Sequence, residues 1–390
     1  MTPSPADLDR IRAEVAGALG SFIGRKRGDL ARIAPDLLAC TDAITDLLGG
    51  GKRLRPAFCY WGWRARGGPD GAPIFAAAAA LELLHASALV HDDVMDSSET
   101  RRGQPAVHRR FAAVHRQADW SGSADRFGAG AAILVGDLLL AWTDELIRRS
   151  GLPADAVERG LAVLDPMRTE VFAGQYLDLV AQASAASRDP AAQVQEALRV
   201  VTYKSAKYTV ERPLHLGAAL AGGIAAGGTR AGSTASGSTA SGSTATGSTA
   251  ADGEDPVRTA LSGYGIPVGV AFQLRDDILG VFGDPAQTGK PVTDDLREGK
   301  RTVLLALAAE RADSAQERVL TGSVGNPDLT EADAGRVREV ISRTGALAEC
   351  EQMIEANVKQ GLAALEGAPI TPEAGRALAD LAVAATSRLH

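Results

Sequence analysis

Apolar residues recur at helical spacing along most of the chain. The segment Ile74 to Met95 follows Pro73 and is almost entirely apolar until His91, so it predicts a long helix that is buried on most sides. The segment Ala129 to Arg149 predicts a second long helix of the same kind. Alternation of β-branched and polar residues is scarce, and no glycine-rich turn follows a predicted strand. The pattern therefore favours helices over strands.

Four more segments carry the helical periodicity. They are residues 166–179, 191–220, 264–281 and 301–311. Alanine, leucine, glutamate and arginine are abundant in them, and these residues favour helix. Pro213 should kink or split the second segment, because proline has no backbone N–H to donate. We predict an all-α fold, a single-domain bundle of many helices.

One stretch lacks any such pattern. Residues 232–250 repeat Gly-Ser-Thr-Ala units and contain no charged and no large apolar side chain. This composition cannot bury enough surface to offset the entropy lost on ordering. We therefore expect a disordered Gly/Ser/Thr/Ala-rich insertion at about 222–255, between two helices of one domain that spans residues 1–390.

The overall charge argues against one class of partner. The 390 residues carry a formal net charge of −7, so we expect no nucleic acid partner. The three cysteines, Cys40, Cys59 and Cys350, have no CxxC spacing and suit a reducing cytosol. The N-terminal residues are polar, and Asp137 interrupts the apolar run 131–140. We therefore expect a cytoplasmic protein with no integral membrane segment.

Two aspartate-rich motifs carry the chemistry. The first has aspartates at positions 92, 93 and 96 and follows the long apolar helix. Asp92 and Asp96 are four residues apart, so on a helix they share a face. A solvated acidic helix end is the plain alternative, but Arg101 and Arg102 follow within one loop. Carboxylates this close repel each other unless a cation neutralises them, and a divalent metal is the simplest such cation.

The second motif runs from Gln273 to Asp277, and Lys290 and Lys300 follow it. If the helices that carry the two motifs face each other, their carboxylates form a cage of oxygens. Such a cage holds Mg²⁺ together with substrate phosphates, which the lysines and arginines would also bind. The predicted metal ligands are Asp92, Asp96, Asp276 and Asp277.

In this order the motifs resemble those of the trans-isoprenyl diphosphate synthases, the polyprenyl synthetase family. The other matching stretches are Gly50-Gly51-Lys52-Arg53-Leu54-Arg55-Pro56, Lys204-Ser205, Phe272-Gln273, Gly289-Lys290 and Gly299-Lys300-Arg301-Thr302. The resemblance implies an isoprenoid synthase fold with a central cavity. It also implies a Mg²⁺-dependent prenyltransferase, a homodimer, that joins isopentenyl diphosphate head to tail to an allylic diphosphate.

The resemblance implies a role for each matching residue. Those on the isopentenyl diphosphate side are Lys52, Arg55, His85 and Arg102. Those on the allylic diphosphate side are Arg101, Lys204, Lys290 and Lys300. Ser205 and Gln273 would line the pocket in which the allylic cation forms. The residues nearest the reaction would be Asp92, Asp96, Arg101, Lys204 and Asp276. Without the resemblance, His85 reads as a packed core histidine.

The chain departs from the family pattern at one position. Many members have a third aspartate in the second motif, where this chain has Gly280, and Asp284 lies one turn further on. This departure weakens the case for full metal binding at the second motif. Asp137 and Asp178 match family positions, but each also reads as an ordinary polar helix residue, and we do not assign them as ligands.

Product length depends on the residues one turn before the first motif. Ser87 and Ala88 are both small, whereas short-product members of the family carry aromatic residues here as a floor. Leu84, one turn deeper, is the next residue that would stop the growing tail. We predict C20 geranylgeranyl diphosphate, with C15 farnesyl or C25 diphosphate as alternatives. We also expect Ser87→Phe to shorten the product.

Two other functions are compatible with the same fold. A non-catalytic regulatory subunit of a heteromeric synthase tends to lose motif residues, but Asp92 and Asp96 are intact here. A terpene cyclase has no second diphosphate to hold, whereas Lys52, Arg55 and His85 match the side that binds isopentenyl diphosphate. We therefore expect an active prenyltransferase.

Overall fold

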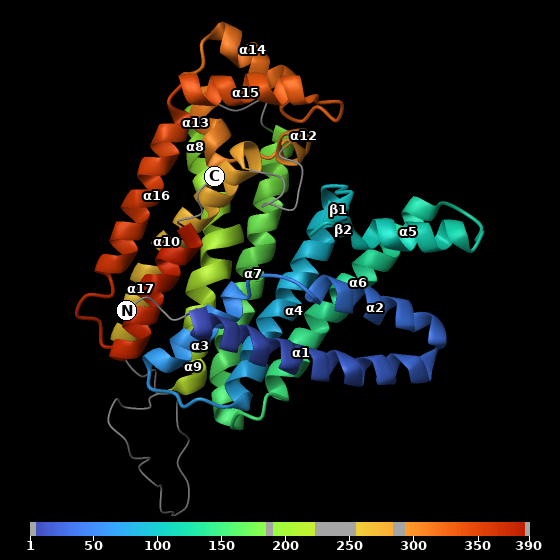
Figure 1. Ribbon diagram of the computed structural model, residues 1–390, viewed down its shortest axis with the longest axis vertical. Coiled ribbons are helices and arrows are strands. Elements are labelled where there is room, and N and C mark those ends of the chain that lie inside the picture. The colour runs from blue at the N-terminus through green and yellow to red at the C-terminus, as the bar shows by residue number, and fades with distance from the viewer. Residues whose placement is uncertain (1–4, 185–189, 223–254, 284–292, 387–390) are drawn as a thin grey trace, which may run out of the picture.

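Helices make up nearly all of the structure. The computed structural model describes residues 5–184, 190–222, 255–283 and 293–386, and within these ranges the only strands are one short antiparallel pair (Figure 1). The all-α prediction is confirmed. Lys290, Asp284 and nearly all of the predicted insertion at 222–255 lie outside the described residues.

The elements follow in chain order. The first half contains α1 (Pro5–Ile33), the 3₁₀ turn η1 (Pro35–Leu37), α2 (Leu38–Leu48), α3 (Leu54–Ala65), α4 (Ala72–Met95), β1 (Thr100–Arg101), β2 (Gln104–Pro105), α5 (Val107–Gln117), α6 (Ala124–Arg148) and α7 (Ala154–Ser184). The second half contains α8 (Pro190–Val200), η3 (Val201–Glu211), α9 (Arg212–Ala221), α10 (Pro256–Phe282), α12 (Asp294–Arg297), α13 (Val303–Arg311), α14 (Ser314–Ser323), α15 (Glu331–Arg343), α16 (Ala346–Ala363) and α17 (Pro372–Thr386).

Helix α4 is a core helix. It packs against α1, α3 and α6, and most of its residues are buried, as its apolar sequence predicted. Pro73 lies in its first turn, where the missing N–H costs no intrahelical hydrogen bond. Among the described helices only α4 is long and apolar enough to cross a membrane, but 72% of that apolar window is buried inside the protein.

Several predicted helices start elsewhere than expected. Helix α6 begins five residues early because the side chain of Ser123 caps it by accepting from the backbone N–H of Arg126. Helix α10 begins eight residues early because the carboxylate of Asp255 caps its first turn, and it runs on through Pro267. Helix α7 likewise runs through Pro166, the residue at which the sequence predicted a start. Packing outweighs the cost of these internal prolines.

The long segment that contains Pro213 is not broken at that residue: α8, η3 and α9 follow one another without a gap, and only the type of helix changes. Between α8 and α9 the backbone of η3, residues 201–211, has the wider turns of a π-helix. Pro213 lies in the first turn of α9 and has no N–H to donate to the Thr209 carbonyl, so that backbone hydrogen bond is missing where the π-helical turns of η3 give way to α9. Gly174 of α7 and Gly269 of α10 allow η3 to pack closely, because a Cβ on either would lie within 2.6 Å of the η3 backbone.

Buried apolar side chains form two clusters. One is built mainly from α1, α3, α4, α6 and α9, and the other mainly from α8, α10, α13, α15 and α16. Helices η3 and α10 pack on each other and contribute to both clusters, for example through Tyr208 and Val201 of η3 and through Tyr264 and Leu274 of α10. These two helices therefore join the clusters, and they carry much of the site described next.

Candidate active site

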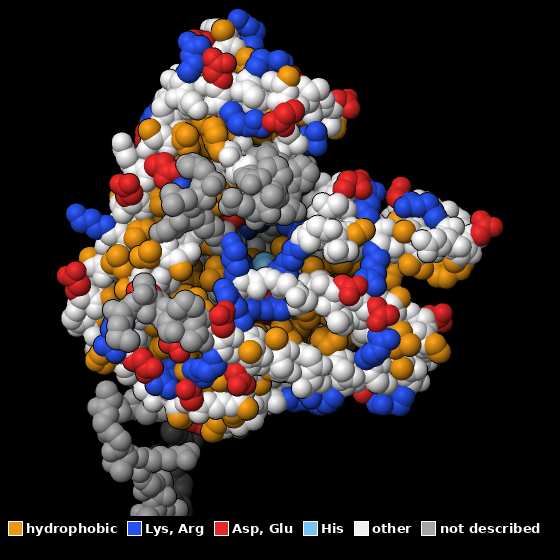
Figure 2. All heavy atoms as spheres, viewed as in Figure 1, with side chains coloured by type: hydrophobic (Ala, Val, Ile, Leu, Met, Phe, Trp, Pro, Cys, Tyr) orange, Lys and Arg blue, Asp and Glu red, His pale blue; other side chains and the backbone are white. Residues whose placement is uncertain are grey.

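A cavity of about 720 Å³ is lined by α4, α7, η3 and α10, together with residues around the starts of α3 and α13. Figure 2 shows a hollow in the middle of the visible face with Lys and Arg side chains around it. The predicted site residues that line the cavity are Lys52, Arg55, His85, Asp92, Arg101, Lys204, Ser205, Gln273, Asp276, Asp277 and Lys300. Motifs that are far apart in the sequence thus meet in one cavity.

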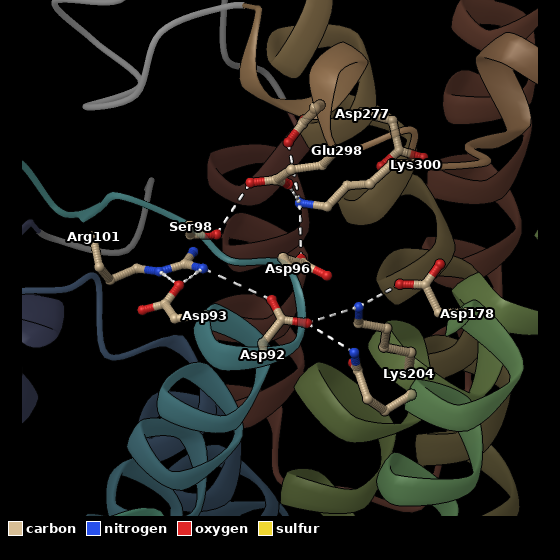
Figure 3. Close-up of polar contacts among 12 residues, drawn as sticks. Asp92, Asp93, Asp96, Ser98, Arg101, Asp178, Lys204, Asp277, Glu298 and Lys300 are labelled. Carbon is tan, nitrogen blue, oxygen red and sulfur yellow. Dashed lines mark hydrogen bonds and ion pairs between the residues drawn. The ribbon is translucent and has the colours of Figure 1, made fainter. Parts of the chain in front are cut away.

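Asp92 lies near the end of α4 and is surrounded by donors. Its Oδ1 accepts a hydrogen bond from Gln175 Nε2 at 2.9 Å and lies 3.2 Å from Lys204 Nζ (Figure 3). Arg101 Nη2 lies 3.7 Å from its Oδ2. Burial raises the pKa of Asp92, but the charges of Lys204, Lys300 and Arg101 outweigh burial, so the pKa is lowered overall. Asp92 is therefore ionised.

Asp96, one turn later, is in a different electrostatic state. Its backbone N–H donates to the Asp92 carbonyl at 2.8 Å and closes the helix. Its buried Oδ2 has no hydrogen-bond partner among the described residues, and Lys300 Nζ is 3.9 Å away. Burial, followed by the charge of Asp92, raises the pKa of Asp96 to about 7. A cation between these two carboxylates would favour the ionised form of both.

Lys204 is held within the π-helix η3, facing two carboxylates. Its Nζ lies 2.6 Å from Asp178 Oδ2 as well as near Asp92 (Figure 3). Burial lowers the pKa of Lys204, but the charges of Asp92 and Asp178 outweigh burial and raise it. Lys204 is therefore a fixed cation beside the first aspartate motif.

Lys300 lies just before α13 and is surrounded by carboxylates. Its Nζ is 3.1 Å from Asp295 Oδ1, 2.8 Å from Glu298 Oε2 and 3.9 Å from Asp96 Oδ2. Burial opposes its charge, but these carboxylates raise the pKa of Lys300 well above its usual value. Glu298 also accepts a hydrogen bond from Ser98 Oγ at 3.1 Å (Figure 3). This network ties the segment after the first motif to the segment before α13.

The second aspartate motif lies on α10. Gln273 Nε2 donates to Asp277 Oδ1 at 2.8 Å, whereas the buried Asp277 Oδ2 has no hydrogen-bond partner in the part of the chain that the structure describes. Burial raises the pKa of Asp277 to about 8 and outweighs the hydrogen bond from Gln273, which lowers the pKa; the charges of Asp276 and Asp295 add smaller increases. Asp276 lines the cavity beside it.

Another wall of the cavity carries the residues predicted to bind isopentenyl diphosphate. The Arg55 guanidinium lies over the Tyr208 ring, 4.4 Å from its centroid, and donates to Thr209 Oγ1 at 2.9 Å. Burial, and then the charges of Arg55 and other arginines, lowers the pKa of His85 well below its usual value, so the imidazole is neutral. His85 Nδ1 has no hydrogen-bond partner within the described ranges, which does not suit a satisfied core histidine.

Arg53 anchors the loop that presents these residues. It has a left-handed backbone with φ of 54°, and its guanidinium pairs with Glu82, a buried carboxylate on α4. The same guanidinium donates to the Leu48 carbonyl. Because this ion pair directs Arg53 into the core, its neighbours Lys52 and Arg55 are left on the cavity side.

The structure separates the two adjacent arginines of the first motif. Arg101 Nε donates to Asp93 Oδ1 at 2.8 Å, and Arg101 lines the cavity (Figure 3). Arg102 instead donates through Nη1 to the carbonyls of Leu47 and Gly50, at 2.8 and 2.9 Å. Its φ of 55° places it in the tight turn between β1 and β2. Arg102 thus holds the same loop as Arg53, and it is not brought to the cavity wall.

The structure corrects the prediction about the tail path along α4. Ala88 and Leu89 line the cavity, but Ser87 does not: its exposed fraction is 0%. Leu84 is also fully buried. Ala88 shares the helix face of Asp92, four residues on, whereas Ser87 is turned by roughly 100° from Ala88. Ala88, and not Ser87, is therefore the position at which a larger side chain would enter the cavity.

Several residues of this site were not expected from the sequence. They are Gln175, Asp178, Tyr208, Thr209, Asp295 and Glu298. Gln175 and Asp178 are three residues apart on α7, so a polar pair on one helix face was the available signal. Asp137, which also matched a family position, is exposed on α6 and lies 3.5 Å from His91 Nε2, away from these residues.

The residues present fit Mg²⁺ when a diphosphate shares the site. Carboxylates of both motifs line the cavity or lie beside it, and Asp96 Oδ2 and Asp277 Oδ2, which accept no hydrogen bond from the described residues, are oxygens of the kind that Mg²⁺ prefers. No three Asp, Glu, His or Cys side chains of the described ranges are close enough to hold a metal ion by themselves. A metal here would therefore take further ligands from the bound diphosphate and water.

Comparisons with known proteins agree with this geometry. The polyprenyl synthetase family model matches residues 38–231 and 230–342. The chain is 30% identical over 323 residues to a short chain isoprenyl diphosphate synthase of Methanothermobacter thermautotrophicus, covering 83% of this chain and 82% of that protein. It is 29% identical over 357 residues to a geranylfarnesyl diphosphate synthase of Aeropyrum pernix, covering 90% of this chain and 94% of that protein.

A solved structure is also closely similar. It is a geranylgeranyl pyrophosphate synthase from Corynebacterium glutamicum complexed with isoprenyl diphosphate and magnesium, with a TM-score of 0.85 and 38% identity, covering 98% of this chain and 99% of that one. The all-α fold, the cavity with two aspartate motifs and these matches together identify an isoprenyl diphosphate synthase, an enzyme that transfers prenyl groups. The chain belongs to the polyprenyl synthetase family. The predicted family, fold and enzyme class are confirmed.

Proposed function

We propose that the chain makes geranylgeranyl diphosphate from isopentenyl diphosphate and an allylic diphosphate, and that it requires Mg²⁺. One observation carries the proposal: the two aspartate motifs, on α4 and α10, reach one cavity together with Lys204 and Lys300. The residues that would hold the metal are Asp92, Asp96, Asp276 and Asp277. Bound Mg²⁺ would supply positive charge that stabilises the departing diphosphate.

The allylic diphosphate would bind where fixed cations converge. Arg101, Lys204 and Lys300 each contact a carboxylate in the cavity or beside it. If Asp92 and Asp96 bind the metal, the guanidinium of Arg101 and the ammonium groups of Lys204 and Lys300 that face them would be available to the diphosphate oxygens. Fixed cations in a site that excludes water stabilise charge as the C–O bond breaks. Lys290 would join this set, as the sequence predicts. The allylic cation would form beside Ser205 and Gln273, and the released diphosphate would accept the proton lost after the new C–C bond forms.

Isopentenyl diphosphate would bind at the opposite wall. Lys52 and Arg55 would contact its phosphate oxygens, and neutral His85 would donate a hydrogen bond. Arg102 would contribute by holding the loop through the carbonyls of Leu47 and Gly50.

The C20 product length is supported by the cavity wall. Ala88 is the side chain that α4 presents one turn before Asp92, and its small size leaves room for a growing tail. The C. glutamicum relative is named for the same product. The other named relatives differ in product length, so the C15 and C25 alternatives are outcomes of the test.

We also propose that the enzyme is a cytoplasmic homodimer in which residues 1–390 work as one domain. Helix α6 exposes a run of large apolar side chains, with 38% of Phe127, 45% of Ile133 and 64% of Leu134 accessible. Figure 2 shows hydrophobic side chains along the lower edge of the arm that α5 and the start of α6 form. A two-fold contact would bury such a face. Light scattering tests this: wild type should be dimeric and Leu134→Glu should shift towards monomer.

The magnesium requirement is tested by removing ligands. Asp92→Ala and Asp96→Ala should each lower turnover by at least about a hundredfold, because each removes a direct metal ligand. Asp137→Ala is the matched control, since it removes an exposed aspartate on α6. Full turnover in either motif variant, or in the presence of a strong chelator, would overturn the metal assignment.

The binding sites for isopentenyl diphosphate and for the allylic diphosphate are tested separately. Lys52→Ala and Arg55→Ala should raise KM for isopentenyl diphosphate more than KM for the allylic primer, since each loses a charge-assisted phosphate contact worth roughly 1.5–3 kcal/mol. Lys204→Ala is the matched variant on the other side and should show the reverse preference. Equal effects on both substrates would contradict the assignment.

A further inference from the structure

The space beside Gly280 is filled by another carboxylate. A Cβ at position 280 would overlap Asp295 Oδ2 and lie 3.1 Å from Asp295 Cγ. Asp295 belongs to the short helix α12, which lies outside the second aspartate motif. The chain therefore lacks the third aspartate of the motif on α10, but it has a carboxylate where the side chain of that aspartate would begin.

This carboxylate lies beside the second motif. Gly280 follows Asp276 by four residues and Asp277 by three, so it lies next to both on the surface of α10, and all three line the cavity with Asp295. Asp277 Oδ2 is buried and has no hydrogen-bond partner among the residues that the structure describes. A buried carboxylate oxygen without a donor, with other carboxylates nearby, is the arrangement that a cation satisfies.

The contact of Asp295 with Lys300 does not account for this placement. Asp295 Oδ1 is 3.1 Å from Lys300 Nζ, but Glu298 Oε2 is closer, at 2.8 Å. Without Asp295, Lys300 would keep its ion pair with Glu298; Asp295 accepts the hydrogen bond from Lys300 Nζ through Oδ1, whereas its Oδ2 lies against Gly280. Both Glu298 and Asp295 pair with Lys300. Of the two, Asp295 is the one that lies against α10 at Gly280.

We propose that Asp295 is a ligand of the second Mg²⁺ site, where it replaces the aspartate that other family members carry at position 280. Gly280 and Asp295 are then a matched pair, because a side chain at 280 would displace the ligand. This inference rests on the magnesium requirement proposed above and adds a residue from outside both motifs.

The test counts bound metal rather than activity. Mn²⁺ binding to the full-length protein is measured by electron paramagnetic resonance in the presence of saturating inorganic diphosphate. Asp295→Ala should weaken one class of bound Mn²⁺ by at least about tenfold. Asp295→Asn, which keeps an acceptor for Lys300, should weaken the same class. Wild-type binding by both variants would overturn the proposal.

Three further variants distinguish a metal ligand from a residue that only supports the structure. Glu298→Gln removes the closer partner of Lys300 and should change Mn²⁺ affinity by less than about threefold if Asp295 acts on the metal. An effect as large as that of Asp295→Ala would show that both act through Lys300, and would overturn the proposal. Gly280→Asp combined with Asp295→Ala should recover most of the lost affinity, whereas Gly280→Asp alone should not bind better than wild type. Failure of the folded double variant to recover also counts against it.

The outcome for wild type distinguishes this inference from the proposed function. If the wild-type protein binds no Mn²⁺ with diphosphate, the magnesium requirement fails and this inference fails with it. The other case is that the wild-type protein binds Mn²⁺ and that Asp92→Ala weakens this binding whereas Asp295→Ala does not. In that case only the role of Asp295 is wrong.

Discussion

Pairing of buried charges decides what individual residues of this protein do. Arg53 is part of a motif that binds phosphate by resemblance, but its guanidinium is committed to Glu82 in the core. Asp277 differs from Arg53, because its buried Oδ2 has no hydrogen-bond partner among the described residues. One buried charge therefore supports a loop, and the other leaves an oxygen available to a cation.

The Arg53–Glu82 pair should stabilise the fold and position the loop. Glu82→Ala leaves a buried guanidinium uncompensated, so it should lower the free energy of unfolding by about 3–5 kcal/mol and raise KM for isopentenyl diphosphate. Replacing both residues with apolar ones, as in Arg53→Met/Glu82→Leu, should recover much of the stability but not the KM, because the loop loses its anchor. Chemical denaturation and steady-state kinetics measure the two effects. Wild-type stability in Glu82→Ala would show that the pair supports nothing.

The buried carboxyl of Asp277 should make the stability of the metal-free protein depend on pH. Its folded-state pKa of about 8 lies above its unfolded value, so the ionised carboxyl opposes folding. This destabilisation grows as pH rises from about 4 to about 8 and is complete above that range. Asp277→Asn should therefore raise Tm of the metal-free protein more at pH 8.5 than at pH 5. A gain that is the same at both values would contradict the raised pKa.

At the scale of the element, helix faces explain which residues reach the cavity. Helix α4 presents His85, Ala88 and Asp92 to the cavity, while Ser87 and Leu84 are fully buried. The glycines of α7 and α10 let the π-helix η3 approach closely, so that Lys204 reaches Asp92. A difference of one residue along α4 therefore separates the wall of the cavity from the core.

This difference predicts opposite results for two neighbouring substitutions. Ala88→Phe should place a ring in the cavity beside the growing tail, and the product should shorten from C20 towards C15 with the fold intact. Ser87→Phe should overpack the core and lower stability by roughly 1–3 kcal/mol without the same shortening. Products are compared by mass and stability by denaturation. If Ser87→Phe shortens the product and Ala88→Phe does not, the assigned helix faces are wrong.

The sequence predicted features that arise from local pattern and from ordered motifs. The apolar run of α4 and the cavity residues from Lys52 to Lys300 are of this kind, whereas the break expected at Pro213 is absent. It did not predict the π-helix η3, because its turns depend on close packing against α7 and α10. Nor did it predict that Arg102 would turn to two loop carbonyls or that Asp295 would fill the space at Gly280, since both contacts are set by tertiary packing.

At the scale of the whole molecule, the described segments on either side of the Gly/Ser/Thr/Ala-rich stretch are anchored independently. Helix α9 ends at Ala221, and Asp255 caps α10 and pairs with Arg66. Deleting residues 232–250 should therefore leave Tm and turnover nearly unchanged, because closure entropy varies slowly with loop length. Thermal unfolding and the standard assay check this. A lost unfolding transition or a large drop in turnover would show that the stretch contributes to structure or function.

The central claim is that one cavity joins isopentenyl diphosphate to an allylic diphosphate with Mg²⁺ and stops at C20. The most direct measurement incubates the purified protein with isopentenyl diphosphate, Mg²⁺ and a C5, C10 or C15 allylic primer in separate reactions, and identifies products by mass. The account predicts geranylgeranyl diphosphate as the main product with each primer that is accepted, and no product when the metal is chelated. No elongated product from any primer, or elongation that persists without metal, would contradict it.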